Sequence, residues 1–81
     1  MNIELIKELD KILPVVARVH GDNHPELQQV VTCYEAIKEN PSKEGFEKLR
    51  EVTQNYKIPE DACPTYTKAY QNLAALDREF A

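Results

Sequence analysis

The sequence predicts an all-α fold, a small up-and-down bundle of about four helices in one domain spanning residues 1–81. Apolar residues recur at steps of three and four in every long segment, which is the period of one helical face. Alternation with a period of two does not persist, and the chain has only two glycines, so strands are not expected. Eighty-one residues suffice for one small hydrophobic core.

The first helix is expected to end near His20. Its apolar stripe leads to the ring of that histidine and consists of Ile6, Leu9, Leu13 and Val16. Pro14 lies inside the stripe, and because proline lacks an N–H and clashes with the preceding turn, we expect a kink or a restart there. Gly21 favours a left-handed end to this helix.

Three further helices are expected, at about residues 25–39, 42–55 and 62 or 64–80. Before the second, His24, Pro25 and Glu26 form a turn motif, with proline in the first turn and an acid near the helix start. We interpret this motif as structural. Residues 57–61 form the connector to the last helix.

The charge balance argues against nucleic acid as the usual partner of this protein. Fourteen acidic residues outnumber ten scattered basic ones, giving a net charge of −4, whereas phosphate contacts need clustered Lys and Arg. No apolar run approaches a membrane span of roughly 20 residues, and no signal peptide is visible. We therefore expect a cytoplasmic protein that binds neither nucleic acid nor membrane. Phosphate-loop, serine-hydrolase and zinc-protease motifs are absent, so the sequence predicts no enzyme.

Two cysteines are too few for a structural zinc site, and in the cytosol they are expected to stay reduced. Cys33 is predicted beside the helical core. Cys63 is predicted near a helix start, a position that favours thiolate chemistry and makes it a candidate redox residue. A Cys–His nucleophile pair would require one of the two cysteines to meet His20 or His24 in space, and nothing in the spacing demands this.

His20 allows two interpretations. It continues an apolar stripe, so its ring either packs at the edge of the core or serves as an inward metal ligand, as histidines do in helical-bundle metal sites. The spacing favours the first. His20 and His24 are separated by a turn, so they do not share a helix face as paired zinc ligands must.

Two segments carry a family resemblance. Residues 16–27, Val-Ala-Arg-Val-His-Gly-Asp-Asn-His-Pro-Glu-Leu, resemble the second helix and following turn of hemerythrin-like (HHE cation-binding) iron–sulfur cluster repair proteins, a di-iron family associated with nitric-oxide and oxidative stress. Residues 55–66, Asn-Tyr-Lys-Ile-Pro-Glu-Asp-Ala-Cys-Pro-Thr-Tyr, are similar to the start of that family's last long helix, and the match continues to Leu73. The two matches occur in the family's order over roughly two-thirds of the chain.

The resemblance implies that His20 corresponds to an iron ligand, whereas Cys63 matches a cysteine without an assigned role. Most of the other family ligands have no counterpart here: residues 37–41 replace one His-x-x-x-Glu segment, and residues 42–46 replace an expected Glu-His. A di-iron centre needs roughly five to seven protein ligands. We therefore expect no cofactor in the monomer, and an iron site only where an oligomer completes it.

These features favour a cut-down, non-catalytic relative of the hemerythrin-like domain that acts as an interaction or regulatory module, as a homo-oligomer or with a protein partner. The alternative is a protein that binds iron or haem at a site completed across a homo-oligomer, with His20 as the inward ligand. A remnant without a selected role fits the same pattern.

Overall fold

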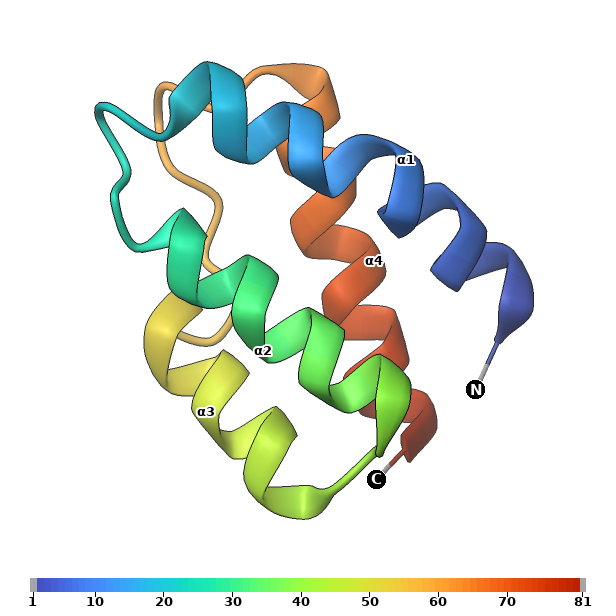
Figure 1. The fold of residues 1–81 in the computed structure, drawn as a ribbon. Coiled ribbons are helices and arrows are strands. Elements are labelled where there is room, and N and C mark those ends of the chain that lie inside the picture. Colours follow the sequence, from blue (N-terminus) through green and yellow to red (C-terminus); the bar gives the residue numbers. More distant parts are fainter. Residues whose placement is uncertain (1, 81) are drawn as a thin grey trace.

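The computed structural model describes residues 2–80, which fold into four α-helices (Figure 1). They are α1 (Ile3–His20), α2 (Leu27–Glu39), α3 (Lys43–Thr53) and α4 (Pro64–Phe80). No strand occurs within this described part of the chain. The predicted all-α class and the number of helices are thus confirmed. None of the described helices is both long enough and apolar enough to cross a membrane.

The helices pack mainly as two pairs. In one pair α1 lies against α4, and in the other α2 lies against α3, while α1 also contacts α2 and so connects the pairs (Figure 1). Helices α1 and α4 are antiparallel. Asn2 donates to Glu79 at one end of this pair, and His20 meets Cys63 at the other.

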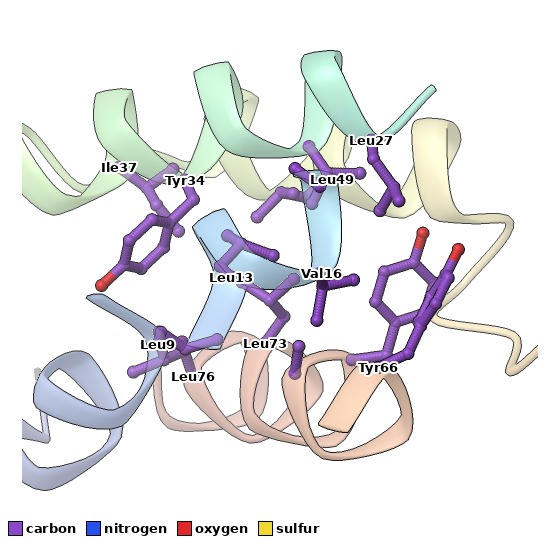
Figure 2. Close-up of a cluster of buried hydrophobic side chains, with 14 of the residues drawn as sticks. Leu9, Leu13, Val16, Leu27, Tyr34, Ile37, Leu49, Tyr66, Leu73 and Leu76 are labelled. Atoms are coloured by element: carbon purple, nitrogen blue, oxygen red, sulfur yellow. The ribbon is translucent and has the colours of Figure 1, made fainter. Parts of the chain in front are cut away.

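One hydrophobic core fills the space between the helices, and all four contribute to it (Figure 2). Its largest fully buried side chains are Tyr34, Tyr66, Tyr70, Phe46, Leu9, Leu13, Leu27, Ile37, Leu49, Leu73, Leu76 and Val16. The stripe predicted for the first helix supplies Leu9, Leu13 and Val16. Burial of such side chains contributes roughly 1.5–3 kcal/mol each before the entropy cost of ordering them.

Helix α1 runs through Pro14 without a restart, and its ribbon changes direction along its length (Figure 1). Proline cannot donate to the carbonyl of Asp10, one turn earlier. The Asp10 carboxylate, however, accepts hydrogen bonds from the Tyr34 hydroxyl at 2.7 Å and the Lys38 ammonium at 2.8 Å. The bond from Lys38, followed by that from Tyr34, lowers the pKa of Asp10. These contacts attach α2 to the segment that proline weakens.

The predicted left-handed conformation of Gly21 is wrong. Its φ and ψ are −59° and −32°, so the chain leaves α1 in a right-handed turn in which Asn23 and His24 donate to the carbonyl of His20. Glycine is nevertheless required sterically, because a Cβ at this position would collide with the carbonyl oxygen of Ala17.

The predicted starts of the second and third helices need small corrections. Helix α2 begins at Leu27, and Pro25 and Glu26 belong to the preceding turn. Ser42 is the N-cap of α3, its hydroxyl accepting the N–H of Gly45 at 3.0 Å. A Cβ on Gly45 would lie 2.5 Å from Cγ2 of Ile37, so this glycine allows α3 to approach α2 closely.

The end of α3 carries the left-handed backbone. Gln54, Asn55 and Tyr56 have φ values of 55°, 64° and 63°, a conformation that costs a residue with a Cβ roughly 1–2 kcal/mol. Tyr56 is held there by two bonds: its N–H donates to Thr53 at 2.9 Å, and its hydroxyl donates to Asp77 at 2.8 Å. The same carboxylate accepts both short bonds from Arg50. This turn directs residues 57–62 toward the start of α4.

Replacing Gln54, which is exposed, with glycine is expected to stabilise the protein by about 1 kcal/mol, because glycine adopts the left-handed helix end without the Cβ penalty. The matched control is Gln71→Gly on the exposed face of α4, where glycine should destabilise by about 1 kcal/mol. Urea unfolding of both variants measures the two signs. Equal destabilisation by both substitutions would contradict the assigned backbone.

Candidate thiol–imidazole site

Cys63 lies at the start of α4, immediately before Pro64. Its sulfur accepts the backbone N–H of Tyr66 at 3.4 Å, three residues into the chain that follows. The thiol thus occupies the position of a helix N-cap, where the first N–H groups of a helix lack partners within the helix and favour negative charge. The predicted location of Cys63 near a helix start is confirmed.

His20 is the second member of the site. Its Nε2 lies 3.3 Å from Sγ of Cys63, within hydrogen-bond distance for sulfur, and both side chains are half-buried. The contact forms because α1 ends where the antiparallel α4 begins. The residue spacing does not predict a cysteine–histidine pair, but the structure contains one. Of the two interpretations of His20, the ring at the edge of the core agrees with this position.

Tyr66 forms the inner wall of the site. Its ring is 5.0 Å from the ring of His20 and 5.5 Å from that of His24, with an edge-to-face arrangement in both cases. The side chain is fully buried, and burial raises the pKa of its phenol. Since Tyr66 also donates its N–H to the sulfur, a single residue contacts both members of the pair and limits the orientations open to His20.

His24 connects the 21–26 turn to the segment before Cys63. Its Nε2 lies 2.9 Å from Asp61 and its Nδ1 lies 3.1 Å from Glu26. The hydrogen bond to Asp61 raises the pKa of His24 against the opposing effect of burial, and the same bond lowers the pKa of Asp61. The predicted turn motif of His24, Pro25 and Glu26 thus makes a tertiary contact, which the sequence did not suggest.

This contact should make stability depend on pH. The raised pKa of His24 stabilises the fold below 6.5, and this contribution is lost as the pH rises through the folded value. The lowered pKa of Asp61 stabilises the fold above 3.8, and this contribution is lost as the pH falls through the folded value. The melting temperature of the natural protein minus that of His24→Gln should therefore be largest between pH 3.8 and 6.5 and smaller at pH 8. A difference that grows above pH 7 would contradict the arrangement.

Cys33 provides a natural contrast to Cys63. It lies in α2 beside the core, as predicted, and it borders a shallow surface pocket together with Lys48 of α3. Burial raises its pKa despite that lysine. Both thiols are free. The two cysteines therefore lie in different surroundings, and among the hydrogen bonds between described side chains only Cys63 has a histidine partner.

The residues present do not fit a di-iron centre in one chain. Within residues 2–80 no group of three or more His, Cys, Asp or Glu side chains is arranged to hold a metal ion. His20, predicted as a metal ligand from the resemblance alone, has Cys63 at its Nε2. The only metal-type donors that this pair offers are one nitrogen and one sulfur.

The chain matches no protein-family model, no curated protein and no solved structure. The resemblance of residues 16–27 and 55–73 to hemerythrin-like repair proteins therefore gains no support from these comparisons and stays a prediction.

Proposed function

We propose that the chain is a non-catalytic regulatory module, descended from a hemerythrin-like domain, whose interactions are controlled through the thiol of Cys63. The observation that carries this proposal is the 3.3 Å approach of His20 Nε2 to Cys63 Sγ at the start of α4. A thiol in that setting has a base to accept its proton and backbone N–H groups to receive the negative charge of its sulfur.

The chemistry follows from the geometry of the pair. The thiolate is the reactive form of cysteine, and a neighbouring imidazolium and a helix N-terminus are two established means of favouring it. Nε2 of His20 can take the proton, while the N–H of Tyr66 already points at the sulfur. A reactive thiol of this kind needs no metal.

A change at this sulfur can be transmitted to the surface. Adding a group to Sγ would compete with the His20 contact and the Tyr66 N–H bond, and so would loosen the junction of α1 with α4. Val19, 63% exposed, directly precedes His20, and an exposed apolar residue there is available to a partner. Control of binding by a second copy or by another protein would follow from local movement at this junction.

The first test is the alkylation of the two cysteines by iodoacetamide at pH 7, followed by peptide mass spectrometry. Cys63 should react on the order of tenfold faster than Cys33, because burial raises the pKa of the Cys33 thiol, whereas the sulfur of Cys63 lies against Nε2 of His20 and the N–H of Tyr66. The advantage should largely disappear in His20→Ala, whereas His24→Gln should retain it.

Cys33 serves as the internal reference in each variant, and circular dichroism checks that the helices persist. If Cys63 of the natural protein reacted no faster than Cys33, the proposed control through this thiol would be wrong.

The second candidate is a metal-binding protein whose site is completed by two copies. One observation favours it. In a tetrahedral zinc site, Zn–S and Zn–N bonds of about 2.3 and 2.05 Å separate the two donor atoms by about 3.5 Å, close to the 3.3 Å between His20 Nε2 and Cys63 Sγ. Two copies would supply two sulfurs and two nitrogens. Thiolate and imidazole donors suit zinc better than the iron or haem of the alternative function that the sequence leaves open.

This candidate predicts about one metal ion per two chains, as a full tetrahedral set needs four ligands. Plasma mass spectrometry of tag-free protein from zinc- and iron-supplemented cells, with light scattering of the same sample, measures both quantities. His20→Ala should abolish the metal together with the dimer. A metal-free protein would remove this candidate.

A further inference from the structure

We infer that Cys63 is a site of oxidation by hydroperoxides, at which the sulfur becomes a sulfenic acid beside His20 and the start of α4. This inference rests on the proposed function, because it requires the same activated thiol. It adds the class of reactant and the covalent product. Three observations carry it: the surroundings of the thiol, the charges next to it and the location of the other cysteine.

The site suits a small reactant. Cys63 and His20 are both half-buried, and the fully buried ring of Tyr66 closes the inner side. Hydrogen peroxide and short alkyl hydroperoxides are small enough to approach from the exposed side alone.

The charges beside the pair disfavour anionic reactants. Glu60 and Asp61 precede Cys63 in the sequence, and Asp22 follows His20 by two residues; all three are exposed. The basic residues in the same part of the sequence are Arg18, which is exposed, and His24, whose pKa Asp61 raises. Opposition between like charges lowers the encounter rate of an anion such as glutathione or its disulfide. A neutral hydroperoxide meets no such barrier.

The reaction balances with these residues alone. The thiol proton passes to Nε2 of His20, and a sulfur lone pair attacks one peroxide oxygen. The S–O bond forms as the O–O bond breaks. The leaving group, hydroxide from hydrogen peroxide or alkoxide from an alkyl hydroperoxide, takes the proton from Nε2 and departs as water or as an alcohol. The sulfur loses two electrons and the peroxide gains them.

The location of Cys33 determines what happens to the product. A sulfenic acid normally condenses with a second thiol to form a disulfide. Cys33 lies on the α2–α3 surface with Gln28 and Lys48, whereas Cys63 lies at the α1–α4 junction. The oxidised Cys63 therefore has no resolving cysteine on its own face of the chain. The sulfenic acid should persist until a thiol from outside the chain reduces it.

The test treats the folded protein with one equivalent of hydrogen peroxide and then unfolds it in urea that contains excess dimedone, which traps sulfenic acids, so that access to the folded site does not limit the trapping. Mass spectrometry maps the adduct. We expect the adduct on Cys63 of the natural protein and its absence from Cys33. The rate should fall on the order of tenfold in His20→Ala and in His20→Gln, but not in Cys33→Ser. The comparison of the two cysteines in the natural protein needs no variant, so a misfolded variant does not decide the result.

The outcomes separate this inference from the function on which it rests. Fast alkylation of Cys63 without a dimedone adduct would overturn the inference alone and leave the activated thiol in place. Slow alkylation would overturn both. Equal trapping on Cys33 and Cys63, or an intrachain disulfide between them, would also overturn the inference, since either requires surroundings different from those described.

Discussion

The antiparallel packing of α1 against α4 is the contact on which the other features depend. Leu9, Leu13 and Val16 of α1 are fully buried together with Leu73 and Leu76 of α4. Apolar burial has no direction of its own, but two antiparallel helices joined by their faces must bring the end of one to the start of the other. His20 and Cys63 meet for this reason, and the site is a consequence of how the core is filled.

Polar contacts determine the path of the chain between α3 and α4, which apolar packing alone does not specify. Asp77, held by Arg50 and Tyr56, stabilises a left-handed turn after α3, and His24 with Asp61 holds the segment that leads into α4. Tyr56, which contacts Asp77, precedes residues 57–60, and Asp61, which contacts His24, follows them. They determine where the connector runs, and thereby where Cys63 begins the last helix. Asp61 is 51% exposed and Arg50 is 37% exposed, and ion pairs that solvent reaches contribute little to net stability. Their main effect here is on the path of the connector.

A thiol beside an imidazole at a helix start can act as a nucleophile, as a redox centre or as half of a metal site, and these uses need the same two side chains. What separates them is the environment. Acidic groups and partial burial favour small neutral reactants, whereas a tetrahedral metal requires a second copy at the same junction. A regulatory thiol needs only one chain.

The sequence by itself determined the helices, because apolar periodicity and the Asn-Pro-Ser break are local signals. It also located Cys63 at a helix start and the stripe that leads to His20. It could not determine that these residues meet, since they are 43 positions apart and no local preference encodes the pairing of two helices. The prediction of a left-handed Gly21 was wrong, because glycine is needed there to avoid a clash with the carbonyl oxygen of Ala17. Gln54 adopts the left-handed conformation instead. Local chemistry specified the elements, and the filling of a common core decided which side chains became neighbours.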